Sequence, residues 1–137
     1  MEKRNIAIFC IYDFNKKILF QHRSKNAPTL PSNWGFFGGK IEQGETPRQA
    51  VIRECFEELK YNLIKPKLII VHNFIYKQYD FTYYIFVEQY NPDKDLILCE
   101  GQNLNWFNLP ELNKTNMIDE DKYVAKAIYD RLFISVN

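Results

Sequence analysis

The chain of 137 residues is long enough for one domain with a substantial core and too short for two. Its 18 basic and 17 acidic residues leave a formal net charge of +1, so charge gives no reason to expect a nucleic-acid polymer or an anionic membrane as a partner. Hydrophobic residues make up 46% of the chain, which excludes a disordered protein, and no apolar run approaches the roughly 20 residues of a membrane-spanning helix.

The N-terminal third predicts strands and loops. Residues 5–12 are rich in β-branched and aromatic side chains and predict a strand. Asp and Asn predict a turn over residues 13–17, after which residues 18–23 form the hairpin partner. The polar, proline-containing residues 24–33 predict a loop at the rim of a pocket, and residues 34–37 predict a short apolar strand. In that strand Trp34 is a core residue or a base-stacking surface, and we favour the core.

A glycine pair and a helix start follow. Gly38 and Gly39 predict a turn at which the backbone can approach a ligand closely. Thr46 suits the N-cap of a helix, Pro47 its first position and Gln49 the partner position of a capping box. No Gly or Pro interrupts the following ten residues, so we expect a helix over residues 47–59.

One face of this helix is apolar. Val51, Cys55 and Leu59 recur at intervals of four residues and predict a stripe that packs on the core. Ile52 and Phe56 are expected to widen that stripe.

The opposite flank gathers carboxylates. Glu54, Glu57 and Glu58 share one face, and Arg53 lies one turn from Glu57. A solvated face is the ordinary interpretation of a Glu-rich helix. Three neighbouring carboxylates repel one another, however, unless a cation lies among them, and hard oxygen ligands suit Mg²⁺ or Mn²⁺.

The spacing of these residues carries a resemblance. Gly39, Glu45 and the run from Arg53 to Glu58 match the pattern GX5EX7REUXEE, so the segment resembles the Nudix box. Six matched positions have a chance rate on the order of 10⁻⁷ to 10⁻⁸ per starting residue. Lys60 stands where the pattern has glycine, and Tyr61 where it has an aliphatic residue.

The resemblance implies a fold and an activity. It implies a single Nudix hydrolase domain over residues 1–137, an α/β/α sandwich with a central mixed sheet. The MutT type implies Mg²⁺-dependent hydrolysis, with Mn²⁺ as an alternative ion. The favoured substrate is a nucleoside triphosphate or an oxidised one, cleaved to the monophosphate and pyrophosphate. Dinucleoside polyphosphates, nucleotide sugars and a non-catalytic nucleotide-binding module remain alternatives, and a homodimer is also open.

The resemblance also implies roles for residues. The implied metal ligands are the Gly39 carbonyl and the carboxylates of Glu54, Glu57, Glu58 and Glu100, where Glu100 belongs to a Glu-Gly-Gln segment before Trp106. Glu57, Glu58 and Glu100 are the candidates for the general base. Arg53 is expected to hold the carboxylates, and Gly38 and Glu45 to support the junction of loop and helix. Arg23 and Lys40 are candidates for phosphate contact, and Asn116, Asp119 and Asp121 for contact with the base.

The remaining chain predicts strands and a closing helix. Residues 67–78 and 81–90 predict two long strands with a hairpin between them, and residues 96–99 a short one. Several tyrosines in the long strands, Tyr79 and Tyr83 among them, are interpreted as strand packing. Residues 119–133 predict an amphipathic helix whose buried face is expected to contain Val124, Ala127, Ile128 and Leu132.

Cysteine usage indicates the compartment. Cys10, Cys55 and Cys99 are odd in number, widely separated and without the spacing of a metal site. We interpret them as reduced thiols and expect a cytoplasmic protein.

Overall fold

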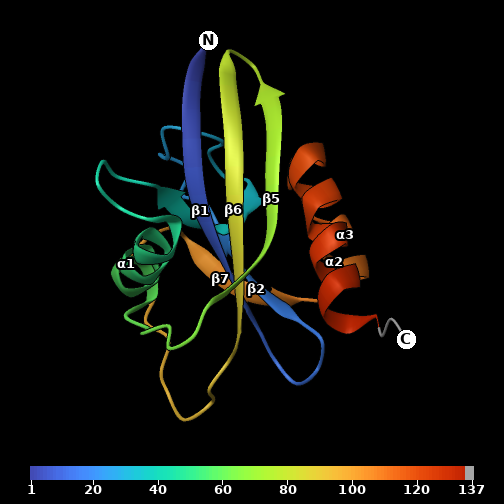
Figure 1. Cartoon of the computed structure of the whole chain (residues 1–137). Helices are drawn as coiled ribbons and strands as arrows, with labels where there is room; N and C mark the ends of the chain where they lie inside the picture. Colours follow the sequence, from blue (N-terminus) through green and yellow to red (C-terminus); the bar gives the residue numbers. More distant parts are fainter. Residues whose placement is uncertain (135–137) are drawn as a thin grey trace.

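The computed structural model of the protein describes residues 1–134 and shows a mixed sheet between helices (Figure 1). The strands are β1 (Glu2–Tyr12), β2 (Ile18–His22), β3 (Trp34–Gly35), β4 (Phe37–Lys40), β5 (Lys67–Tyr76), β6 (Tyr79–Gln89) and β7 (Asn103–Phe107). The helices are α1 (Pro47–Leu59), α2 (Leu109–Asn113) and α3 (Asp119–Phe133). The expected α/β/α sandwich is confirmed. Within the described residues, no helix has the length and apolarity needed to cross a membrane.

The sheet is organised around β1. Its order is β3-β2-β1-β6-β5, with β4 added to β1 and β7 added to β2. The β1–β6 pair is parallel along the whole of β1, whereas the other pairs are antiparallel. On its other side β1 pairs with β4 from Ile6 to Phe9 but meets β2 only at Tyr12. The sheet therefore opens between β4 and β2.

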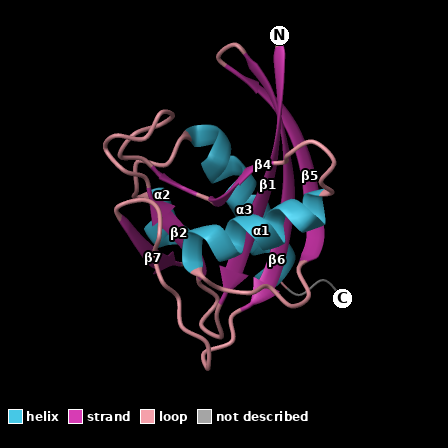
Figure 2. Cartoon of the chain, turned by 90° about the vertical axis from the view of Figure 1, so that its left-hand side faces the viewer, coloured by secondary structure: helices cyan, strands magenta, loops and turns pink. Residues whose placement is uncertain are grey.

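Two apolar clusters cover the two faces of the sheet. Because side chains alternate along a strand, Ala7 and Phe9 face α1, whereas Ile8 and Cys10 face α2 and α3. Figures 1 and 2 show α1 on one side of the sheet and α3 on the other. This arrangement buries both faces of β1 and makes it a rigid support for the strands that pair with it and the helices that pack on it.

The start and the apolar face of α1 follow the sequence prediction. Thr46 accepts a hydrogen bond from the backbone of Gln49, and the Gln49 side chain accepts one from the backbone of Thr46. Val51, Cys55 and Leu59 are fully buried. Phe56 was expected to widen this stripe, but it is 44% exposed, because its position lies a further 100° around the helix from Cys55.

The helix ends at an unusual residue. Lys60 is the C-cap and adopts the left-handed conformation, with φ 52° and ψ 31°. Its backbone N–H donates to the carbonyl of Phe56. The left-handed cap for which glycine is preferred thus forms here with a lysine, at the cost of backbone strain.

Several other expectations were wrong. Gly38 and Gly39 do not form a turn but lie inside β4, and the expected strand over residues 34–37 is interrupted at Phe36. Residues 96–99 form no strand, because their backbone N–H groups donate to carbonyls at the end of α1. The hairpin turn consists of residues 77–78 rather than 78–80. In α3, Ala125 and Tyr129 are buried instead of Ala127.

Candidate active site

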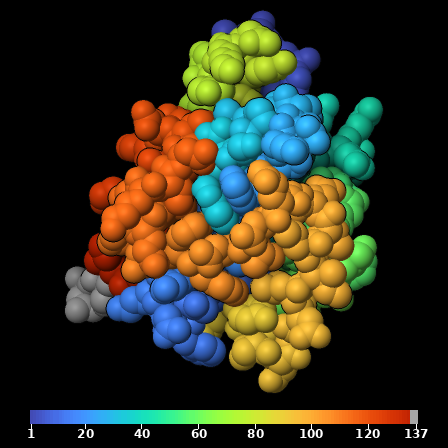
Figure 3. Space-filling model, turned by 180° about the vertical axis from the view of Figure 1, so that it is seen from behind, coloured from blue at the N-terminus to red at the C-terminus, as the bar shows by residue number. Residues whose placement is uncertain are grey.

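A cavity of about 870 Å³ lies where β2 diverges from β4. Glu54, Glu57 and Glu58 of α1 line it from one side. Tyr83 of β6 and Asp121 of α3 line it from another. Figure 3 shows the segment around residues 24–34, in light blue and cyan, beside the orange-red part of the chain that leads into α3. The volume is within the range of small-molecule sites.

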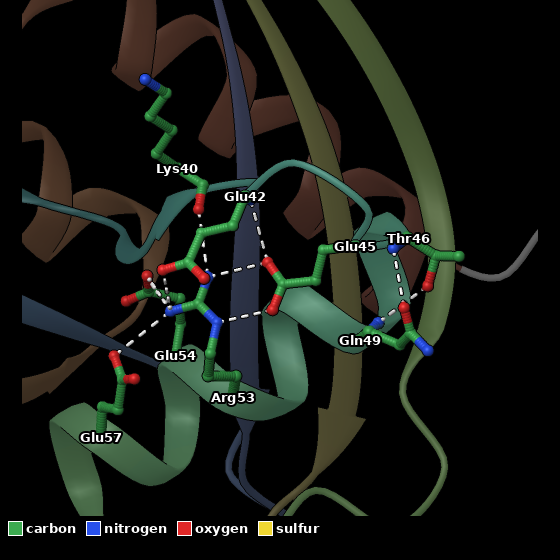
Figure 4. Close-up of polar contacts among 8 residues, drawn as sticks. All are labelled: Lys40, Glu42, Glu45, Thr46, Gln49, Arg53, Glu54 and Glu57. Atoms are coloured by element: carbon green, nitrogen blue, oxygen red, sulfur yellow. Dashed lines mark hydrogen bonds and ion pairs between the residues drawn. The ribbon is translucent and has the colours of Figure 1, made fainter.

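The guanidinium of Arg53 organises the carboxylates (Figure 4). Its Nε and one terminal nitrogen contact the two oxygens of Glu45 at 2.6 and 2.9 Å. The other terminal nitrogen contacts Glu54 at 2.8 Å and Glu57 at 3.3 Å. A further hydrogen bond of 3.1 Å reaches the carbonyl of Lys40. One planar group therefore joins the loop before α1, the end of β4 and two helix carboxylates.

This arrangement keeps Glu45 ionised. The hydrogen bonds from Arg53, followed by one from the Glu42 backbone, lower the pKa of Glu45 to about 2. Hydrogen bonding to Glu45 raises the pKa of Arg53 in turn. The Arg53–Glu45 pair is thus charged at neutral pH and joins the loop before α1 to the helix.

Glu58 is in a different environment from the one expected. The sequence placed it on an exposed flank, but its side chain is 2% exposed, and its Oε2 atom is buried without a hydrogen-bond partner. Burial, reinforced by the charges of Glu54 and Glu100, raises the pKa of Glu58 to about 9. Burial also raises the pKa of Glu54. A buried carboxylate oxygen without a donor is costly unless a cation or a proton neutralises it.

The glycine pair allows two close approaches to β4, one by β1 and one by α1. A Cβ on Gly39 would lie 2.4 Å from carboxyl atoms of Glu54, and a Cβ on Gly38 would lie 2.2 Å from the carbonyl oxygen of Ala7. Glycine at position 38 therefore lets β4 lie close to the backbone of β1, and glycine at position 39 lets the Glu54 carboxylate of α1 lie against bare backbone. This close approach is the structural reason for the glycine in the sequence pattern.

The donor set fits a hard divalent cation. Among the described residues, no three His, Cys, Asp or Glu side chains already form a group that could hold a metal ion, and Arg53 engages Glu54 and Glu57. All candidate ligands are oxygen donors, which suit Mg²⁺ or Mn²⁺. The partnerless oxygen of Glu58 is the observation that supports a cation at this position.

Glu100 approaches this group from another part of the chain. It lines the cavity, and its negative charge contributes to the raised pKa of both Glu54 and Glu58, after burial. Gln102 fixes the segment, because its side chain donates to the carbonyl of Arg23 at 2.7 Å and its backbone N–H to that of His22 at 2.9 Å. No role was predicted for Gln102 from the sequence, although the Glu-Gly-Gln motif contains it.

Arg23 lines the cavity, and its charge acts on both Glu58 and Asp121. Its guanidinium donates to the carbonyl and hydroxyl oxygens of Thr29 at 2.8 and 3.1 Å. Its positive charge partly offsets the burial that raises the pKa of Glu58, and the same holds for Asp121. One guanidinium therefore influences both ends of the cavity.

The three candidates for contact with the base, Asn116, Asp119 and Asp121, differ in their position relative to the cavity. Asp121 is 5% exposed, accepts a hydrogen bond of 2.8 Å from the Tyr83 hydroxyl and lines the cavity. Its pKa is raised to about 6 by burial, against the effect of the Tyr83 hydrogen bond. Asp119 is exposed and is not part of the cavity wall.

Asn116 instead binds the backbone of the loop that leads into β3. Its side chain accepts from the backbone N–H of Trp34 at 2.9 Å and donates to the Ser32 carbonyl at 3.0 Å. Trp34 stacks on His22 with ring centroids 4.8 Å apart and packs against the core while also lining the cavity. Lys40 is exposed, and its side chain points away from the carboxylates (Figure 4). Only its carbonyl contributes to the site.

The family follows from a direct match. A model of the NUDIX domain matches residues 1–128, so the chain belongs to the NUDIX domain family. It is 44% identical over 59 residues to the 8-oxo-dGTP diphosphatase of Escherichia coli (strain K12), a match that covers 43% of this chain and 45% of that protein. It is 34% identical over 89 residues to the RNA pyrophosphohydrolase of Blochmanniella floridana, covering 64% and 51%.

A solved structure supports the fold over its whole length. The MutT protein from Methanosarcina mazei Go1 superposes with a TM-score of 0.83 at 21% identity, covering 98% of this chain and 97% of that one. At 21% identity this structural similarity establishes the mixed α/β fold and no more. The matched segments span about half the length of these two curated relatives. The relatives indicate the class of reaction but do not determine the substrate.

Proposed function

We propose that the protein is a Mg²⁺-dependent pyrophosphohydrolase that cleaves a nucleoside triphosphate, or an oxidised one, to the monophosphate and pyrophosphate. The observation that carries the proposal is the buried, partnerless oxygen of Glu58 beside Glu54, at the mouth of a nucleotide-sized cavity. A structural helix face would not bury a carboxylate in this way. The named relatives, a diphosphatase and a pyrophosphohydrolase, support the same reaction class.

The cation would be held by carboxylates of α1, by Glu100 and by the Gly39 carbonyl. When bound, a divalent cation offsets the charge of the phosphates and makes water a better nucleophile. Arg53 keeps the carboxylates in place, because it already bridges Glu45, Glu54 and Glu57. Mn²⁺ is the alternative ion, since the same hard oxygen donors accept it.

Proton transfer from the attacking water falls to a carboxylate that remains free to accept it. Glu57 is the most exposed of the helix carboxylates, at 51%, and Glu100 is exposed and faces the same cavity. Glu58 is only 2% exposed, and its partnerless oxygen is the proposed cation ligand, so this carboxylate is not free to accept a proton. We therefore favour Glu57 or Glu100 over Glu58 as the general base.

The rest of the cavity receives the nucleotide. Arg23 would bind a phosphate, because a guanidinium matches phosphate oxygens and this one lines the cavity with its charge acting on Glu58 and Asp121. Asp121 and Tyr83 would contact the base, with Phe36 as an apolar wall. Asp121 thus replaces Asn116 and Asp119 as our candidate for base contact.

Two features of the chain concern its cellular compartment and its oligomeric state. Cys10 and Cys55 are buried free thiols, which supports a reducing compartment such as the cytoplasm. On β5, Val71 and Ile75 are exposed, and they provide a surface on which a homodimer could form.

The test is a substrate panel with Mg²⁺ and with Mn²⁺ that measures pyrophosphate against phosphate release. Nucleoside triphosphates, 8-oxo-dGTP, dinucleoside polyphosphates and nucleotide sugars form the panel. We expect pyrophosphate from the triphosphates. Binding of nucleotide in calorimetry without turnover of any of these compounds would instead indicate a non-catalytic module.

A single variant tests the metal assignment. We expect Glu57→Gln to lower kcat by about 10³-fold or more, since it removes a cation ligand or the base. Its melting temperature should change little, because Glu57 is half exposed. The matched control is Asp130→Asn, which neutralises a partly exposed carboxylate of α3, far from Glu57 in the sequence. Near-normal turnover by Glu57→Gln would refute the assignment.

A further inference from the structure

Arg4 occupies a place in the cavity that neither the sequence pattern nor the carboxylate site explains. Arg4, Ile6 and Ile8 lie on the same face of β1, and all three line the cavity. Ile8 is paired with Gly38, next to the carboxylates. Arg4 lies four residues further along the strand, about 13 Å away. It therefore marks the far end of the cavity from the phosphate-cleaving group.

The guanidinium of Arg4 is fixed in orientation. Its Cζ atom lies 4.3 Å from the centroid of the Tyr79 ring, within range of a cation–π contact. Its Nε forms an ion pair with Glu2. Figure 3 shows the N-terminus, in dark blue, against the yellow-green tip of the β5–β6 hairpin, above the segment around residues 24–34. Stacking from one side and an ion pair at one nitrogen hold a side chain that would otherwise be mobile.

Two nitrogens of this group remain available. Within residues 1–134, the hydrogen bonds of the Arg4 side chain involve only Nε, so its two terminal nitrogens have no protein acceptor. The side chain is 33% exposed. A planar group with two parallel donors is suited to a ligand that presents two neighbouring acceptors.

Asp121 provides the complementary group on the inner wall. Tyr83, which donates to Asp121, is the strand partner of Ile6, and the next pair on the same face of the sheet, two residues along, is Arg4 with Phe81. Arg4 and Asp121 therefore both line the cavity, with the aromatic side chains of Phe81 and Tyr83 as part of the same wall. The cavity wall therefore carries a hydrogen-bond acceptor, the Asp121 carboxylate, and a pair of donors, the two terminal nitrogens of Arg4.

We propose that Arg4 determines base specificity by donating to the O6 and N7 atoms of guanine. This inference rests on the proposed nucleotide site. Guanine presents these two acceptors on one edge and its N1–H and amino donors beside them, which matches Arg4 and Asp121 respectively. Adenine places an amino group where Arg4 requires an acceptor. In 8-oxoguanine N7 carries a hydrogen, so the same guanidinium favours the unoxidised base.

The test measures binding of product nucleotides, GMP, AMP and 8-oxo-GMP, by calorimetry, and kcat/KM for the corresponding triphosphates. We expect Arg4→Ala to lower GMP affinity by about 10- to 100-fold, the value of a bidentate contact to guanine. AMP affinity should change by less than about threefold, and 8-oxo-GMP should lose less than GMP. In kinetics the loss should be in KM, because Arg4 lies far from the carboxylates.

Two further variants make the result decisive. Arg4→Lys keeps the charge but not the planar fork, and it should also lose the preference for guanine. Lys3→Ala removes the neighbouring charge on the opposite face of β1 and serves as the control. An equal loss for all three nucleotides, full rescue by lysine, or unchanged GMP affinity would each overturn the proposal. Because GMP binding needs no hydrolysis, absence of turnover alone would refute the proposed reaction but not the role of Arg4.

Discussion

Replacing Glu58 with glutamine should make the cation-free protein more stable and at the same time inactive. Glu58 is 2% exposed, and one of its oxygens has no hydrogen-bond partner. Burial raises its pKa from the ordinary 4.5 to about 9. A glutamine of similar shape removes the charge that this environment disfavours.

The magnitude follows from linkage between protonation and folding. The folded pKa is raised, so the stability associated with Glu58 is fully present below pH 4.5 and is lost progressively as pH rises towards 9. At pH 7 the unfolded carboxyl is ionised while the folded one is protonated. Taking up that proton at pH 7 costs about 3.4 kcal/mol, which is the upper limit for the gain in Glu58→Gln.

The assay is urea unfolding in EDTA between pH 5 and pH 9. The stability difference between Glu58→Gln and the wild type should be small near pH 5 and should grow through neutral pH. Adding Mg²⁺ should stabilise the wild type by mass action and should have a much smaller effect on the variant. Glu57→Gln, at a half-exposed position, is the stability control and should stay within about 0.5 kcal/mol of the wild type.

One result would refute this reasoning. If Glu58→Gln were less stable than the wild type at pH 7 in EDTA, with a difference independent of pH, then Glu58 would be an ordinary satisfied carboxylate. The case for a cation at its partnerless oxygen would then fail.

Two other predictions concern the ends of the same motif. Lys60→Gly should raise the free energy of unfolding by about 0.5–1 kcal/mol, measured by urea unfolding, because glycine adopts the left-handed cap without strain; an unchanged or lower stability would contradict the assignment of strain. Gly39→Ala should reduce kcat by about 10²-fold or more and abolish stabilisation by Mg²⁺, because its Cβ would displace the Glu54 carboxylate. Its stability in EDTA should change little, since a flexible side-chain end can move; normal activity would show that the close approach is unnecessary.

Much of the site could be predicted because its information is local. The capping box of Thr46 and Gln49, the stripe of Val51, Cys55 and Leu59, and the pairing of Arg53 with Glu57 depend on the geometry of one helix. Helical spacing is the same in every fold, so these contacts follow from sequence separation. The same regularity made the box recognisable without any knowledge of the sheet.

Residues outside the helix could not be placed in this way. Asn116, Asp119 and Asp121 are close in sequence, and only the docking of α3 against β6 directs Asp121 into the cavity. Arg4 and Tyr79 are far apart in the chain and meet because β1 and β6 are parallel neighbours. No local rule contains that pairing.

The sequence by itself determined the family pattern, the carboxylates of α1 and the helix that carries them, since short-range geometry and residue chemistry suffice for these. The tertiary structure decided how those groups behave. It buried Glu58 and thereby raised its pKa, placed Gly39 in a strand against Glu54, and opened the sheet between β4 and β2 to form the cavity. Burial and long-range pairing arise only when distant segments pack together, which is why the spacing of residues could not reveal them.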